Sequence, residues 1–184
     1  MTCITYLNGV MMADRLSVVD NSNVPIIVDA TKLFISKKGD LAMAKSSTII
    51  TDDDAQQIMD LVRPLIAKGE REIPIKLFDS VFGSKEGMNP YALFVMSSEH
   101  IYTTLNSACY PLTRHNKDMS YPVIDGSGYA YMLIALNNGL SLDDAYAFVS
   151  RNDWRVGKVV NKITQSELTP IVEEQNNVDA DNPQ

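Results

Sequence analysis

The chain has 184 residues, of which 45% are hydrophobic and 21% charged, a balance that predicts one globular domain rather than a disordered chain. Its formal net charge of −7 at pH 7 argues against nucleic acid or an anionic membrane as the main partner, because basic surfaces bind both. The sequence has neither the run of about 20 apolar residues that a membrane span needs nor the pattern of a signal peptide, so we expect a cytoplasmic protein.

The sequence offers few residues for a metal site. It contains two cysteines, Cys3 and Cys109, and two histidines, His100 and His115, and none of them has metal-ligand spacing. We therefore expect no metal and no other cofactor. The cysteines are expected to be free thiols rather than a disulfide.

A first hairpin is predicted at the beginning of the chain. Apolar strands over residues 3–7 and 10–13 flank Asn8-Gly9, a pair that favours a type I′ turn because both turn positions need a positive φ. Residues 15–27 follow. They contain Asn-Ser-Asn and a proline, and are expected to form a loop.

A second hairpin is predicted over residues 31–36 and 41–47, joined at residues 37–40. In its first strand, Leu33 and Ile35 should share one face because side chains alternate along a strand. The returning strand is nearly all small and apolar, which is typical of a strand covered on both faces.

A helix with clear end signals comes next. Thr51 is expected to cap it, and Asp52, Asp53 and Asp54 fill its first turn, where the helix dipole favours anions. Apolar residues at helical spacing continue to Leu65. The three aspartates are interpreted as solvated charges at a helix end rather than as a cation site.

The rest of the chain alternates short strands and helices. The further elements expected are a short helix over 75–82, strands over 92–98, 100–105 and 107–112, helices after Gly128 and Ser141, and a late strand over 157–164. This order disfavours parallel winding and predicts an antiparallel α+β fold. Residues 1–168 should form one domain, and residues 169–184 an acidic, disordered tail.

Five features occur in order along residues 2 to about 163: a threonine behind the initiator methionine that leads a strand, a hairpin, Ala-Asp-Arg, a later Thr-Lys, and Gly-Ser-Gly before a helix. The series resembles the proteasome β-subunit family of N-terminal-nucleophile hydrolases, which includes the bacterial HslV-type protease. The resemblance implies a four-layer αββα sandwich, in which two stacked antiparallel sheets lie between helices. It also implies a threonine peptidase that acts on peptides or unfolded proteins inside a homo-oligomeric ring, with an AAA+ unfoldase as a possible partner.

The resemblance gives a role to each matching residue. Thr2 matches the nucleophile, whose own α-amine serves as its base once the initiator methionine is removed. Lys32 matches the lysine that lowers the pKa of the hydroxyl, and Asp14 the acid that holds this lysine. Ser127 and Asp153 match the residues that position the amine.

The chain also departs from the family pattern. Ser46 and Ser47 occupy the turn where the family usually has a glycine whose amide forms the oxyanion hole, although a main-chain donor does not strictly require glycine. Val156 stands where typical proteasome β subunits have serine, a serine that HslV-type members lack. The helix expected around residues 75–90 looks truncated, and the first hairpin is short.

Each candidate residue also has a purely structural interpretation. Thr2 would be part of a frayed terminus, Asp14 and Lys32 a surface ion pair of little energetic value, Ser127 a helix cap and Asp153 a solvated helix residue. Two classes of function therefore stay open: a threonine peptidase, and a scaffold subunit that keeps the fold but has lost hydrolysis. A small-amide hydrolase on the same fold is a weaker third.

Overall fold

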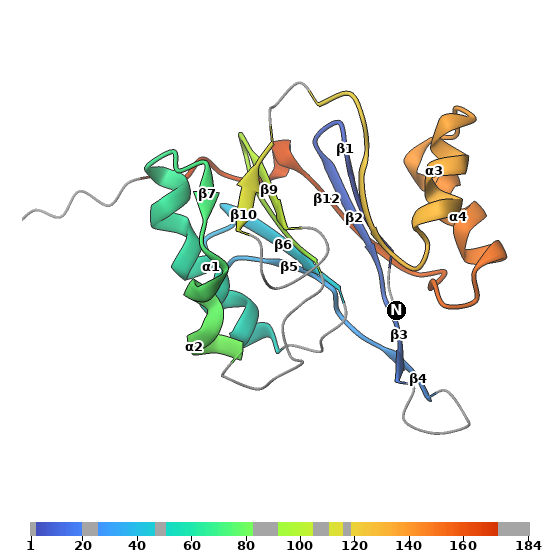
Figure 1. The fold of residues 1–184 in the computed structure, drawn as a ribbon, viewed down its shortest axis with the longest axis horizontal. Coiled ribbons are helices and arrows are strands. Elements are labelled where there is room, and N and C mark those ends of the chain that lie inside the picture. Colours follow the sequence, from blue (N-terminus) through green and yellow to red (C-terminus); the bar gives the residue numbers. More distant parts are fainter. Residues whose placement is uncertain are drawn as a thin grey trace, which may run out of the picture.

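The computed structural model describes residues 3–19, 26–46, 51–82, 92–104, 111–115 and 119–172, and two of the predicted site residues, Thr2 and Ser47, lie outside these ranges. Two antiparallel sheets form the centre of the molecule. In Figure 1, α1 (Asp52–Ala67) lies beside one sheet, and α3 (Tyr129–Asn137) and α4 (Leu142–Asn152) lie beside the other. The expectation of a mixed fold with antiparallel sheets is confirmed.

The four-stranded sheet has the order β11–β1–β2–β12. Its strands are β1 (Cys3–Leu7), β2 (Val10–Asp14), β11 (Val123–Gly126) and β12 (Val160–Thr164). Asn8 and Gly9 join β1 to β2 with φ angles of 49° and 78°, the positive values that a type I′ turn requires. The first predicted hairpin is therefore confirmed.

The six-stranded sheet has the order β5–β6–β8–β9–β10–β7. Its strands are β5 (Leu33–Ile35), β6 (Leu41–Lys45), β7 (Glu72–Ile73), β8 (Leu93–Ser97), β9 (Ile101–Thr104) and β10 (Leu112–Arg114). Strand β6 is buried throughout, as predicted. Leu33 and Phe34 lie on opposite faces of β5, as the predicted alternation requires, and both are buried, whereas Ile35 is 47% exposed. Leu33 packs between the two sheets and Phe34 packs towards α1, so both faces of this strand are covered.

A third, two-stranded sheet corrects the expectation of a loop over residues 15–27. Strands β3 (Leu16–Val19) and β4 (Ile26–Asp29) pair in an antiparallel hairpin. The two segments are rich in β-branched residues, which favour strands. The Asn-Ser-Asn and proline signals fall at positions 21–25, between the strands, and do not interrupt either one.

The helices begin where the sequence predicts. Thr51 caps α1 in a capping box: its hydroxyl accepts from the Asp54 N–H at 3.1 Å, and the Asp54 carboxylate accepts from the Thr51 N–H at 2.9 Å. Ser141 caps α4, and α3 ends before Gly139, which has a φ of 79°. The remaining helical elements are a 3₁₀ turn over Ile75–Phe78, α2 (Asp79–Phe82) and a 3₁₀ turn over Gln165–Glu167. None of the helices in the described part of the chain is both long and apolar enough to cross a membrane.

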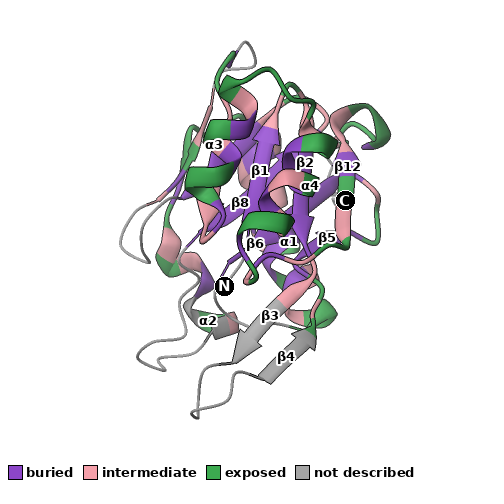
Figure 2. Ribbon diagram, turned by 90° about the vertical axis from the view of Figure 1, so that its right-hand side faces the viewer, coloured by how far each residue is buried: buried purple, intermediate pink, exposed green. Residues whose placement is uncertain are grey.

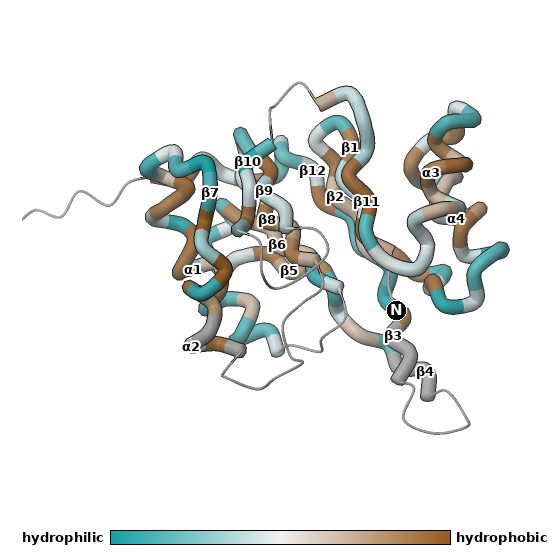
Figure 3. Tube along the Cα trace, in the orientation of Figure 1, coloured by the Kyte–Doolittle hydropathy of each residue, from teal (hydrophilic) through white to brown (hydrophobic). Residues whose placement is uncertain are grey.

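Three apolar clusters hold these elements together. One lies between α1 and the six-stranded sheet, the second contains side chains from both large sheets, and the third lies between the four-stranded sheet and the pair α3 and α4. The central strands are accordingly purple in Figure 2 and largely brown in Figure 3, whereas the outer surfaces of the helices are green in Figure 2. The ends of β2 and β6, and the start of β5, meet near the beginning of β1, and this is where the candidate site lies.

Candidate active site

Asp14 and Lys32 form a buried ion pair. Asp14 ends β2 and Lys32 precedes β5, and the lysine Nζ lies 3.0 Å from each carboxylate oxygen. The side chains are 0% and 4% exposed, respectively. The alternative of a surface ion pair is therefore wrong. Burying two charges is costly unless both are well partnered, so this pair calls for a reason beyond surface stability.

Three backbone N–H groups from separate segments surround the Asp14 carboxylate. The Cys3 N–H donates to Oδ1 at 2.7 Å, and the N–H groups of Leu16 and Gly157 donate to Oδ2 at 3.0 Å each. These donors stabilise the negative charge inside the protein. They also connect Asp14 to Cys3, the residue that follows Thr2 in the chain.

Gly157 was not identified from the sequence as a site residue. A Cβ at this position would lie 2.9 Å from Leu16 Cβ, 3.0 Å from Leu16 N and 3.4 Å from Asp14 Oδ2. Only glycine lets the segment approach closely enough for its N–H to reach Asp14. The signal available in the sequence was its position, four residues after Asp153.

Lys32 is held in an environment that weakens its charged form. Burial lowers the pKa of Lys32 below its ordinary value, although the Asp14 carboxylate acts in the opposite direction. The ammonium also donates to the Leu16 carbonyl. A lysine that is fixed in position and partly desolvated can stabilise negative charge that develops on a neighbouring hydroxyl.

A second group consists of Ser127, Asp153 and Arg155. Asp153 follows the last turn of α4 with its side chain 2% exposed, so the solvated-helix interpretation is wrong. Arg155 donates to both carboxylate oxygens, from Nε at 2.7 Å and from Nη2 at 3.0 Å. Burial raises the pKa of Asp153, but the hydrogen bonds from Arg155 and Ser127 outweigh it, so this pKa lies below its ordinary value. Asp153 is therefore a fixed carboxylate that holds Ser127.

The two groups converge on Cys3. A Cβ on Gly128, at the start of α3, would lie 3.1 Å from Cys3 Sγ and 2.8 Å from Val149 Cγ1, so the Gly-Ser-Gly turn packs directly against β1. The hydroxyl of Tyr146 lies 3.0 Å from the Cys3 carbonyl oxygen. Burial raises the pKa of the Cys3 thiol to about 12, which keeps it protonated and unreactive. Asp14, Lys32, Ser127 and Asp153 are thus gathered around the residue that follows Thr2.

Ser46 does not have the role expected for its backbone. The Ser46 N–H donates to the Ala92 carbonyl at 2.9 Å, next to the pairing of β6 with β8. This N–H is therefore not available as an oxyanion donor. The Ser46 hydroxyl accepts from the Ala92 N–H at 2.9 Å and also bonds to the Asp125 carboxyl group. Burial raises the pKa of Asp125, partly offset by this bond. Asp125 was not predicted as a site residue from the sequence.

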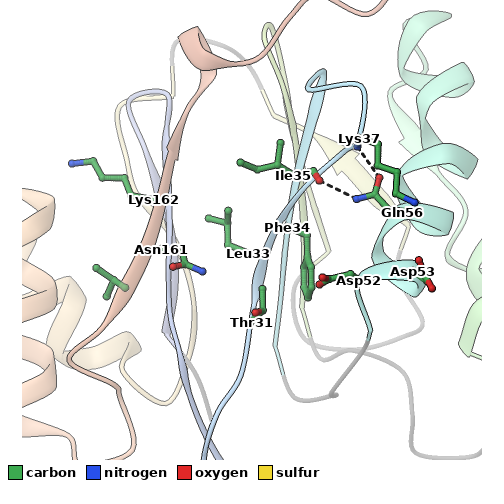
Figure 4. Close-up of a pocket in the computed structure, with 11 residues that line it drawn as sticks. Thr31, Leu33, Phe34, Ile35, Lys37, Asp52, Asp53, Gln56, Asn161 and Lys162 are labelled. Atoms are coloured by element: carbon green, nitrogen blue, oxygen red, sulfur yellow. Dashed lines mark hydrogen bonds between the residues drawn. The ribbon is translucent and has the colours of Figure 1, made fainter.

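A groove of about 620 Å³ lies near these residues but contains none of them (Figure 4). It lies between the free edges of the two large sheets, β12 and β5, and the first turns of α1. Gln56 of α1 donates to the Ile35 carbonyl at 2.9 Å and accepts from the Lys37 N–H at 2.9 Å, so its amide occupies part of the β5 edge. In the part of the chain that the structure describes, no three His, Cys, Asp or Glu side chains form a metal-binding cluster.

No protein-family model and no curated protein sequence matches this chain. Solved structures, in contrast, are similar to this chain. HslV from Trypanosoma brucei aligns with a TM-score of 0.55 at 14% sequence identity, over 88% of this chain and 97% of that one. The Anbu complex from Pseudomonas aeruginosa, solved as a helical assembly, aligns with a TM-score of 0.55 at 13% identity, over 89% of this chain and 80% of that one. This chain therefore has the fold that HslV and Anbu share.

Proposed function

We propose that this chain is a threonine peptidase of the HslV kind, with residues 1–168 as a four-layer αββα catalytic domain and Thr2 as its nucleophile. The observation that carries the proposal is the buried pair of Asp14 and Lys32, bonded through Asp14 to the Cys3 N–H. A purely structural surface contact would not need a desolvated lysine. The Asp14–Lys32 pair is bonded to the N–H of Cys3, so it lies where it can act on Thr2, the residue before Cys3.

In the proposed reaction, the free α-amine of Thr2 takes the proton of the Thr2 hydroxyl. Base and nucleophile belong to one residue, so they meet without an association cost. The oxygen attacks the substrate carbonyl while the Lys32 ammonium stabilises the negative charge on it. The amine then protonates the departing nitrogen of the peptide, which leaves an ester on Thr2. Water, deprotonated by the same amine, hydrolyses this ester and regenerates the hydroxyl.

The other residues position these groups. Asp14 keeps the ammonium of Lys32 in place, and Ser127, held by Asp153, orients the amine of Thr2. With the Ser46 N–H engaged, the oxyanion donor of this proposal is the backbone N–H of Ser47, which lies outside the described residues. This assignment needs no metal and no cofactor.

The proposal includes self-assembly into a closed ring that encloses the sites and is served by an AAA+ unfoldase. Helix α3 supports this self-assembly. It is largely hydrophobic, as its brown colour in Figure 3 shows, yet Tyr129, Tyr131 and Ile134 are 36% to 52% exposed. Such an apolar outer surface suits a contact between copies, and a repeated heterologous contact either closes into a ring or continues as a helix. Sedimentation across protein concentrations tests it, and only a 20.4 kDa monomer would count against it.

The decisive experiment combines intact mass with hydrolysis of fluorogenic peptides. Intact mass reports whether Met1 is removed, and Thr2→Ala should abolish hydrolysis while the fold and assembly persist. Thr2→Ser should keep part of the activity because it keeps the hydroxyl. Thr31→Ala is a matched control, because Thr31 is an exposed threonine beside Lys32. A threonine-directed epoxyketone should inactivate the wild type.

Two results would refute this site: hydrolysis that survives both Thr2→Ala and the epoxyketone, or a retained Met1 with no hydrolysis. The second result would favour the scaffold alternative. One observation supports that alternative. Val156 is 2% exposed and packs in the apolar cluster under α3 and α4, at the position where typical proteasome β subunits have serine.

A further inference from the structure

Asp125 places a carboxyl group between the two large sheets. Side chains alternate along β11: Val123 belongs to the apolar cluster that both sheets share, and Ile124 to the cluster under α3 and α4. Asp125 therefore shares the face of Val123, and its partner in β1 is Ile4, which lies in the same shared cluster. Burial raises the pKa of this carboxyl group above its ordinary value. A polar group in an apolar layer is costly unless it is hydrogen-bonded, so the partners of Asp125 explain its position.

The Asp125 carboxyl group is bonded across the space between the sheets. Ser46 follows β6 and is 4% exposed. Its hydroxyl accepts from the Ala92 N–H at 2.9 Å, so its single hydrogen is left to donate to Asp125. This bond and one from the Gly126 N–H oppose the effect of burial on the pKa, because both stabilise the carboxylate. A continuous chain of hydrogen bonds thus joins the six-stranded sheet to the four-stranded one.

Alternation along β6 explains why a serine, rather than the lysine beside it, meets Asp125. Ala44 belongs to the cluster between the sheets, and Ser46, two residues further on, shares its face. Lys45 belongs to the opposite face of β6. It aligns with Lys32 in the pairing of β5 with β6, and its N–H donates to the Lys32 carbonyl at 3.1 Å. The contact that crosses the sheets is therefore a directional bond between a hydroxyl and a carboxylate.

The two ends of this bond adjoin two turns that the proposed reaction uses. Ser46 precedes Ser47, whose N–H is the proposed oxyanion donor, and we call residues 46–47 the oxyanion turn. Asp125 precedes Gly126, whose φ of 103° is readily available only to glycine and directs the chain out of β11. Ser127, the residue assigned to orient the amine, follows at once. One hydrogen bond thus connects the oxyanion turn with the Gly-Ser-Gly turn.

We propose that Asp125 is a positioning residue: through its bond to Ser46, it fixes the oxyanion turn relative to the Gly-Ser-Gly turn. This inference rests on the proposed function, which gives the two turns their roles. An oxyanion donor is effective only when its N–H points to the place where the negative charge develops. A misplacement of about 1 Å can cost about 10²-fold in rate. Loss of the bond should therefore lower kcat and leave KM nearly unchanged, because the bond affects only the transition state.

The first test compares Asp125→Val with Asp125→Asn in peptide hydrolysis. Valine favours strands and suits the apolar layer, so the protein should fold, but without an acceptor for Ser46 kcat should fall at least about tenfold. Asparagine keeps an oxygen that accepts from the Ser46 hydroxyl, so Asp125→Asn should keep most of the wild-type kcat. If both variants lose kcat equally, the charge itself is required and the positioning role is overturned. A rise in KM with kcat unchanged would overturn it as well.

A cycle of variants tests the bond itself. Ser46→Ala and Asp125→Val break the same bond, so the double variant should lose no more kcat than the more damaging single variant. Losses that multiply would show that the two residues act independently and would overturn the inference. Ser97→Ala is the matched control: Ser97 is a buried serine at the other end of β8, and its hydroxyl accepts from the His100 N–H at 3.1 Å. It should lose stability and keep its kcat, and a loss of kcat equal to that of Ser46→Ala would also count against the inference.

Amide hydrogen exchange separates this inference from the proposed function. In Asp125→Val, the amides of Ser46 and Ala92 should exchange faster although they lie on the other sheet, whereas the amides of β9 and β12 should keep their wild-type rates. This pattern supports the bridge even if the wild type hydrolyses nothing, a result that would overturn only the peptidase proposal. Unchanged exchange at Ser46, or equal acceleration throughout both sheets, overturns the inference.

Discussion

Among the described residues, two ion pairs with a buried carboxylate lie at different ends of the β5–β6 hairpin. Asp40 pairs with Arg63 of α1, with Nε 2.6 Å from Oδ2 and Nη2 3.2 Å from Oδ1, and its Oδ1 also accepts from the Ser36 hydroxyl at 2.6 Å. Asp14 pairs with Lys32 at the other end, among backbone donors from three segments. The first pair is local to a turn and one helix, whereas the second gathers distant parts of the chain.

Burial acts in the same direction on the pKa of both cations, but their net pKa shifts are opposite. Burial lowers the pKa of Arg63, but the carboxylates of Asp40 and Asp60 outweigh it, so this pKa lies above its ordinary value. For Lys32, burial prevails over Asp14 and the pKa lies below its ordinary value. The positive charge of Arg63 is thus fully compensated by the carboxylates of Asp40 and Asp60, which suits a structural role. In the Lys32 pair, Asp14 offsets the cost of burying the ammonium only in part, which suits a site where a further negative charge develops.

Lys32→Met should separate activity from stability most strongly. Methionine keeps much of the volume and removes the charge, while Asp14 keeps its three backbone donors, so the protein should still fold. We expect kcat for peptide hydrolysis to fall by at least about 10³-fold, within the range of such catalytic groups. Activity is measured beside a thermal melt, with Lys37→Met as the control. A variant that retains a tenth of the wild-type kcat would contradict the catalytic role.

Arg63→Met should have the opposite result. It leaves Asp40 buried without its cation, which should lower the free energy of unfolding by about 3 kcal/mol. The kcat of the folded protein should be unchanged, because Arg63 touches none of the candidate site residues. Urea denaturation gives the stability, and peptide hydrolysis below the transition gives kcat. A fall in kcat that matches that of Lys32→Met would erase the distinction between the two pairs.

Gly157→Ala should damage both properties to a smaller extent. The new Cβ would collide with the backbone of Leu16, at a cost of about 1–3 kcal/mol, and would displace a donor of Asp14. We expect kcat to fall about tenfold, since small misplacements are costly in catalysis. Gly39→Ala is the control: its φ is 70°, but no atom lies within 4 Å of the added Cβ. It should lose stability alone, and equal kcat values for the two variants would count against the role of Gly157.

The smallest effect concerns the pH dependence of the Asp40 pair. Burial raises the pKa of Asp40, but hydrogen bonds from Arg63 and Ser36 outweigh it, so the folded-state pKa lies below the unfolded value of about 3.9. The stabilisation is therefore present above about pH 4 and is lost as the pH falls through the folded-state pKa. The difference in unfolding free energy between wild type and Asp40→Asn, from urea titrations at pH 7 to 3, should narrow with acid. A constant difference would mean that the charge of Asp40 is irrelevant.

The sequence predicted the features that depend on near neighbours. The Asn8-Gly9 turn and the caps at Thr51 and Ser141 are encoded within four residues, so local rules suffice. Asp14 and Lys32 were proposed to lie together because their order along the chain resembles a known family. Their burial was not predictable, because it depends on how separate segments pack around them.

The features that were missed depend on strand register and on close tertiary contacts. Three such features follow from which strands pair and in which register. They are the bond of the Ser46 N–H to Ala92, the fit of Gly157 against Leu16, and the alignment of Lys45 with Lys32. Composition and spacing do not specify these. The β3–β4 hairpin was missed for a different reason, because turn signals at its centre were extended over the strands beside them.

The position of Gln56 on the edge of β5 has a consequence for aggregation. Strand β5 is the outermost strand of its sheet, and an open strand edge invites pairing with the same edge of another molecule. The Gln56 carboxamide binds one carbonyl and one N–H of that edge, much as a neighbouring strand would. One helical side chain thereby covers part of an edge that could otherwise pair with another molecule. Replacing it with a shorter residue should be detected first as aggregate during refolding, with the chemistry of each folded molecule left intact.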